Sequence, residues 1–168
     1  MKMTSAFANK MIRKLKEDKE FYLNKEREGY VYVASLDETP VIPDYNYSEV
    51  AAKLEEIDLQ IVKIKHALNL VNATNSVSVS GREYTIDEIL VRMAQLSQRK
   101  ITLDDMRKQQ PKTRINSGPY SAKKAVPEYQ YINYDLDLIK KEYEKIDNEI
   151  ALMQLALDRF NQTFEFEV

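Results

Sequence analysis

The stretch INYDLDLIKKEYEKIDNEIALMQLALDRF, residues 132–160, decides the fold. Its apolar side chains recur at alternating steps of four and three residues, and the positions between them include Lys140, Lys141, Glu142, Glu144, Lys145 and Glu149. This spacing lines up one side of a helix over four heptads. It therefore predicts a long C-terminal helix over 132–161 with a narrow apolar seam: Ile132, Leu136, Ile139, Tyr143, Ile146, Ile150, Met153, Leu157 and Phe160.

A second seam of the same kind precedes it, and Ser48 stands where a helix N-cap is expected. The seam consists of Val50, Leu54, Ile57, Ile61, Ile64, Leu68 and Val71. The first 28 residues predict a less regular helix, an N-terminal extension. The apolar residues that mark one of its sides are Phe7, Met11, Leu15 and Tyr22.

Between the second helix and the next lies NATNSVSVSGREYT, residues 72–85. Valines alternate with serines there, and Gly81 can take a positive φ, so a short β-hairpin is expected. Thr85 and Glu88 form a capping box that begins the third helix, which Pro111 ends near Gln110. That helix carries Ile86, Ile89 or Leu90, Met93, Leu96 and Leu103, with Lys100 breaking the line. We expect 48–110 to form one helical hairpin with a β tip.

Two short segments have strand character: Tyr30–Val33 and the alternating end, residues 164–168. The end could pair with Tyr30–Val33 or with the edge of another subunit. The prediction is a mainly α, single-domain chain over 1–168, an antiparallel coiled-coil-like bundle with short β elements. Narrow seams favour packing between chains, so a homo-oligomer is expected.

The composition excludes several classes of chemistry. The chain has no cysteine, one histidine and three glycines. Thiolate catalysis, zinc–thiolate sites and a phosphate-binding glycine loop are therefore ruled out. His66 has no second histidine to share a metal and is expected on the surface or in packing. We expect no cofactor, no metal site, no enzymatic activity, no membrane-spanning segment and a cytoplasmic location.

The most promising stretch for binding is MRKQQPKTRINSGPYSAKKAVP, residues 106–127, which contains no acidic residue although the chain carries a net charge of −2. Arginine and lysine suit phosphate, and tyrosine rings can stack on bases. Together with Arg82 at the hairpin, the candidate ligand-binding residues are Arg107, Lys112, Arg114, Tyr120, Lys123 and Lys124. The alternative is a solvated basic loop, within 111–131, that covers acidic helix faces.

The order of several short motifs resembles bacterial and prophage septicolysin-like proteins, a family grouped as a domain of unknown function. These motifs are the stretch Asn72–Arg82 with its G-R-x-x-T-I continuation, Tyr120-Ser121, and Asn161-x-Thr163-x-Glu165. The resemblance covers about residues 48–168 and implies a helical hairpin with a β-ribbon tip. Ala122 stands where the family usually has an arginine.

The leading hypothesis is a non-enzymatic oligomer that binds a phosphate-bearing ligand through the basic loop. A small signalling nucleotide, sequestered as in the family's prophage setting, fits the negative overall charge better than duplex DNA. The competing hypothesis is a coiled-coil adaptor or inhibitor that binds another protein through its seams. A third, a metal-dependent two-carboxylate hydrolase, would require carboxylates distant in sequence to meet.

Overall fold

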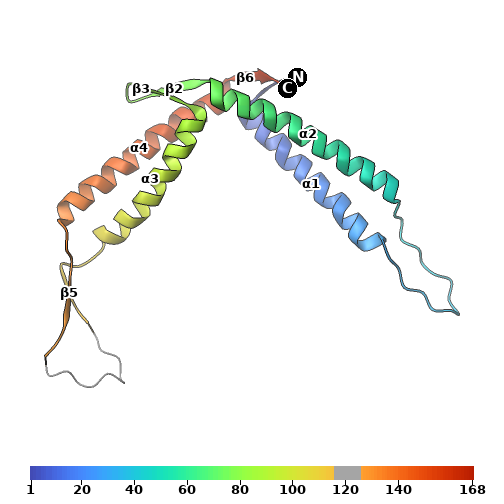
Figure 1. Cartoon of the computed structure of the whole chain (residues 1–168), viewed down its shortest axis with the longest axis horizontal. Helices are drawn as coiled ribbons and strands as arrows, with labels where there is room; N and C mark the ends of the chain where they lie inside the picture. The colour runs from blue at the N-terminus through green and yellow to red at the C-terminus, as the bar shows by residue number, and fades with distance from the viewer. Residues whose placement is uncertain (116–125) are drawn as a thin grey trace. The chain divides into compact units, whose positions relative to one another are not determined.

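The computed structural model describes residues 1–115 and 126–168 (Figure 1). Within these ranges the chain is mainly helical with three short antiparallel strand pairs, which confirms the predicted fold class. The elements are β1 (Lys2–Thr4), α1 (Ser5–Gly29), α2 (Tyr47–Thr74), β2 (Ser76–Val79), β3 (Arg82–Thr85), α3 (Ile86–Arg107), β4 (Lys112–Arg114), β5 (Tyr129–Tyr131), α4 (Leu136–Thr163) and β6 (Glu165–Glu167).

The chain divides into two compact units, described separately below. Unit 1 contains Met1–Val77 and Leu157–Val168, and unit 2 contains Ser78–Ala156. The sequence predicted one helical hairpin over 48–110. In the structure α2 pairs with α1 inside unit 1, and α3 pairs with α4 inside unit 2.

The core of unit 1 lies between α1 and α2. Every second position of the predicted α2 seam is buried, and the positions between are half-buried. The inward side of α1 alternates large apolar residues with small or charged ones, so its heptads are hard to recognise in the sequence. Its positions are Ser5, Ala8, Ile12, Leu15, Lys19, Tyr22 and Glu26. Lys19 donates to both carboxylate oxygens of Asp58 at 2.6 and 2.7 Å. Phe7, expected on the inner side, is instead 48% exposed.

The connection between these helices is tied to the end of α1. The Tyr45 hydroxyl donates to Glu26 at 2.9 Å, and burial together with this carboxylate raises the Tyr45 pKa. A Cβ added at Gly29 would lie 2.5 Å from the Tyr45 Cβ. The N-cap of α2 is Asn46, not Ser48, because the Asn46 side chain accepts hydrogen bonds from the first free amides of the helix.

The two ends of the chain pair with each other. β1 and β6 are antiparallel, with Met3 opposite Phe166, and both of these side chains are buried. The expectation of a strand at Tyr30–Val33 is wrong, since this segment has no strand pairing and all four residues are exposed. Valine and tyrosine favour a strand, but they form one only beside a partner strand. The expected partner, β6, pairs with β1 instead.

Unit 2 is built on α3 and on α4 as far as Ala156. The fully buried side chains include Ile86, Ile89 and Leu103 on α3, so the seam uses Ile89, while Leu90 is 45% exposed. The capping box at Thr85 and Glu88 is present as predicted. α3 ends at Arg107, somewhat before the expected Gln110.

α4 begins at Leu136, four residues later than the seam suggested. The Asp135 carboxylate accepts hydrogen bonds from the amides of Asp137 and Leu138, which caps the helix at that point. Ile132 consequently lies before the helix, where its amide donates to the Pro111 carbonyl. The rest of the predicted seam is buried or half-buried.

Candidate functional site

The basic stretch after α3 contains a two-stranded ribbon, which was not predicted. β4 and β5 are antiparallel, with Lys112 opposite Tyr131, Thr113 opposite Gln130 and Arg114 opposite Tyr129. Backbone hydrogen bonds extend the pairing on both sides, from Ile115 to Glu128 and from Ile132 to Pro111. The segment 111–131 is therefore structured at its base, where sequence analysis expected a loop throughout.

The register gathers four functional side chains on one face of the ribbon. Side chains alternate along a strand, and directly opposite residues share a face. Lys112 and Arg114 thus lie on the same face as Tyr129 and Tyr131, a set called the ribbon face below. The Lys112 Nζ lies 4.1 Å from the Tyr129 ring centroid and 5.5 Å from that of Tyr131. All four residues are exposed.

This arrangement suits an anion attached to a flat ring. An exposed ammonium and a guanidinium can both bind phosphate oxygens, the latter through two parallel hydrogen bonds. Exposed tyrosine rings offer a stacking surface for a base. Within the described residues, the contacts found for Lys112 are with these two rings.

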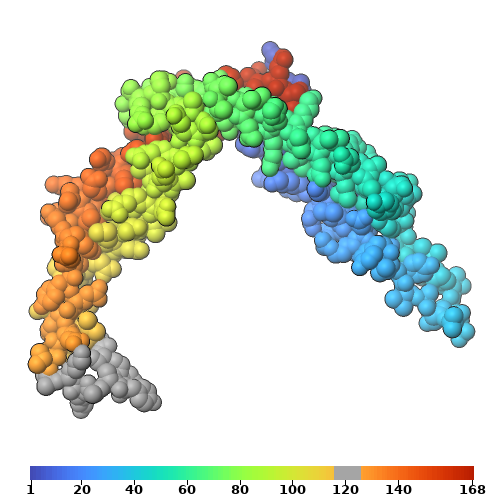
Figure 2. Space-filling view, viewed as in Figure 1, coloured from blue at the N-terminus to red at the C-terminus, as the bar shows by residue number. Residues whose placement is uncertain are grey.

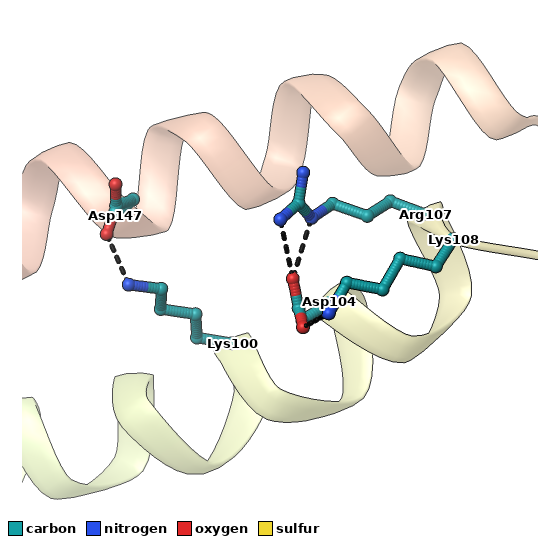
Figure 3. Close-up of polar contacts among 5 residues, drawn as sticks. All are labelled: Lys100, Asp104, Arg107, Lys108 and Asp147. Carbon is teal, nitrogen blue, oxygen red and sulfur yellow. Dashed lines mark hydrogen bonds and ion pairs between the residues drawn. The ribbon is translucent and has the colours of Figure 1, made fainter.

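The base of the ribbon is anchored to the helix pair of unit 2. The Tyr134 hydroxyl donates to the Met106 carbonyl at 2.7 Å. The Arg107 guanidinium lies 4.1 Å from the Tyr143 ring centroid on α4. Lys100 lies near the same ring and forms an ion pair with Asp147 (Figure 3). These contacts join the end of α3 to α4 next to the ribbon.

Arg107, one of the predicted ligand contacts, is engaged inside this anchor. Its Nε and Nη2 donate to the Asp104 carboxylate at 2.8 and 2.7 Å, and Lys108 donates to the other oxygen (Figure 3). Hydrogen bonds from Lys108 and then Arg107 lower the pKa of the Asp104 carboxyl. The bond to Asp104 in turn raises the pKa of Arg107. The guanidinium thus contacts the helix pair and not the ribbon face.

Arg82 lies at the other end of α3. It belongs to β3, directly before the helix, whereas β4 follows the helix end. The 22 residues of α3 span about 33 Å at 1.5 Å per residue, and Figure 1 shows the hairpin and the ribbon at opposite ends. The Arg82 guanidinium lies 4.6 Å from the Tyr84 ring centroid, in an open groove that Glu88 and Arg92 also line. The structure does not bring Arg82 to the ribbon.

Three of the other predicted contacts, Tyr120, Lys123 and Lys124, lie outside the described residues. The structure adds Tyr129 and Tyr131, which sequence analysis did not include among the candidate ligand contacts. A signal for them existed: Lys-Thr-Arg and Tyr-Gln-Tyr each alternate, and tyrosine favours strands.

The remaining chemistry of the described chain is limited. Residues 1–115 and 126–168 hold no group of three or more histidine, aspartate or glutamate side chains that could bind a metal ion. Over the same ranges, no helix is long and apolar enough to cross a membrane. His66 is exposed on α2.

Comparison with known proteins establishes similarity of fold. No protein-family model matches the chain, and no curated protein does. A solved structure described as a functionally unknown conserved protein from Corynebacterium diphtheriae matches with a TM-score of 0.68. The match covers 99% of this chain and 100% of that chain at 16% sequence identity, so the likeness concerns the fold alone.

Proposed function

We propose that this chain is a non-enzymatic, oligomeric helical protein that binds a phosphate-bearing ligand, a small nucleotide, on the ribbon face. The observation that carries the proposal is the β4–β5 register, which sets two cations beside two tyrosine rings. The anionic part of the ligand contacts Lys112 and Arg114, and its base stacks on Tyr129 or Tyr131.

The size of the ribbon supports a small ligand. Each strand has three residues, about 10 Å of extended chain, which matches a nucleotide rather than a duplex. Duplex binding depends on a broad basic surface, and the chain has a net charge of −2. In the sequence, the stretch between the two strands also contains Lys123 and Lys124.

The test is a calorimetric titration with two probes, ATP and inorganic tripolyphosphate, at two salt concentrations. Lys112→Gln and Arg114→Gln should each weaken both probes about fivefold or more, because each removes a charge-assisted contact. Tyr129→Ser should weaken ATP selectively, since tripolyphosphate has no base to stack. Binding should also weaken steeply as salt rises.

Lys14→Gln is the matched control, because Lys14 is an exposed lysine of α1 in unit 1, whereas the ribbon belongs to unit 2. It removes the same charge from the chain and should leave both affinities unchanged. The proposal is refuted if neither probe binds, or if Lys14→Gln weakens binding as much as Lys112→Gln.

The second candidate is an interaction protein. It is favoured by large apolar side chains exposed on α2, including Leu59 and Val62 at 60% and 64%. Docking through such a surface should change little with salt, which separates it from anion binding at the ribbon.

A further inference from the structure

α2 carries a second line of apolar residues, distinct from the seam that faces α1. It consists of Ala52, Leu59, Val62, Leu70 and Ala73, with His66 among them. A helix turns about 100° per residue, which places this line on the side opposite Val50, Ile57, Ile64 and Val71. We call it the outer face of α2.

The outer face is exposed within the part of the chain that the structure describes. Leu59, Val62 and Leu70 are 60%, 64% and 53% exposed, although all three belong to a helix whose other side is core. Figure 2 shows the teal and green surface of α2 with no other segment over it in that view. A helix that is apolar on two opposite sides is expected to be covered on both.

Charges beside the outer face are divided along the helix. Glu55 lies within the N-terminal half of the outer face, and Glu56 lies beside it. Lys63 lies beside the C-terminal half, and His66 lies within it. Glu56 has an ion pair within the helix, to Lys53 at 2.9 Å, and both groups remain more than half exposed. Such a division is complementary to itself when the helix is reversed.

From this self-complementarity we propose that α2 binds α2 of a second copy of this chain, antiparallel, through the outer face. With a two-fold axis between Gln60 and Ile61, Leu59 lies opposite Val62 of the second copy, and Ala52 lies opposite its Asn69, one residue before its Leu70. The same register sets Glu55 against His66 and Glu56 beside Lys63. An acidic half meets a basic half on each side of the axis.

A second copy fits this surface better than an unrelated partner. A two-fold contact must be formed by the same patch on both chains, so its apolar and charged positions must match after reversal. Here Leu59 exchanges with Val62 about Gln60–Ile61, Ala52 falls within one residue of Leu70, and Glu55 exchanges with His66. An unrelated partner would not require that symmetry.

The first test is sedimentation equilibrium of the full chain. The wild type should be a dimer at micromolar concentration. Leu59→Glu should raise the dissociation constant at least about tenfold, equivalent to about 1.4 kcal/mol. Ile101→Glu is the matched control, since Ile101 is equally exposed on α3, at 66%, and should leave the dimer unchanged. A monomeric wild type, or equal effects of the two variants, overturns the proposal.

The second test measures orientation and uses the absence of cysteine from the chain. In the antiparallel register, residues 52 and 70 of different copies lie within about 2 Å of each other along the axis, whereas two copies of residue 52 lie about 25 Å apart. Ala52→Cys mixed with Leu70→Cys should form a disulfide-linked dimer, and neither variant should do so alone. Crosslinking of Ala52→Cys with itself would indicate a parallel pair and overturn the proposal.

A charge exchange tests the same register without touching the apolar contacts. Glu56→Lys and Lys63→Glu should each weaken the dimer by placing like charges together, and the double variant should recover affinity. Additive weakening in the double variant contradicts the register. The ribbon variant Lys112→Gln should leave the dimer intact, which separates this inference from ligand binding.

Discussion

Leu103→Ala tests the helix pair that holds the ribbon. Leu103 is 0% exposed and lies on α3, one turn before Arg107. The change removes the burial of three carbon groups, about 2.4 kcal/mol at 0.8 kcal/mol per group, and leaves part of a cavity. We expect the free energy of unfolding of unit 2 to fall by about 3 kcal/mol.

The assay is urea unfolding followed by far-ultraviolet circular dichroism, combined with amide hydrogen exchange to separate unit 2 from unit 1. Ile101→Ala is the matched control on the same helix, because Ile101 is 66% exposed, and it should cost less than about 0.5 kcal/mol. If Ile101→Ala destabilises unit 2 as much as Leu103→Ala, the assignment of the seam is refuted.

Three further predictions concern single side chains. The pKa of Asp104 is lowered from 3.8, so its stabilising effect is present above that pH and is lost as the pH falls through the folded value. The difference in urea midpoint between wild type and Asp104→Asn should therefore shrink on acidification from about pH 6 to about pH 2, and a constant difference contradicts this. Gly81 has a φ of +81°, so Gly81→Ala should lower stability by about 1 kcal/mol in thermal unfolding. Ser80→Gly, at a φ of +52°, should be neutral or stabilising, and the opposite order would contradict the turn. Because Arg107 contacts Asp104 and Tyr143, Arg107→Gln should change ATP affinity by less than about twofold. A loss of affinity equal to that of Arg114→Gln would show that Arg107 does contact the ligand.

The helices could be predicted because their seams are long and apolar. Seven positions of α2 and nine near α4 repeat the same spacing, and all those within the helices are buried or half-buried. The inward side of α1 was predicted only at Leu15 and Tyr22. Ser5, Ala8, Lys19 and Glu26 also face inward and do not form a large apolar seam. Lys19 can occupy an inward position because it forms an ion pair with Asp58, which lies on α2.

The local caps and strand partners were less predictable. Asn46 and Ser48 are both good N-cap residues. Which of them begins α2 depends on the position of the preceding residue, Tyr45, whose hydroxyl is held by Glu26. The pairing of β1 with β6 depends on bringing together segments separated by almost the whole chain. Spacing along a sequence does not reveal such partners.

The candidate site was only partly predictable for the same reason. The basic composition of 106–127 drew attention to Lys112 and Arg114, but only the register adds Tyr129 and Tyr131 opposite them. Arg82 was grouped with them because an arginine at a hairpin turn has no structural role there, but the length of α3 keeps it at the other end.

The most direct test of anion binding at the ribbon is a nuclear magnetic resonance titration of the isotope-labelled full chain with ATP. Amide signals of Lys112–Arg114 and Tyr129–Tyr131 should shift first and saturably, and those near Arg82 should stay in place. The account is contradicted if the ribbon signals do not move, or if the saturable shifts cluster around Arg82 instead.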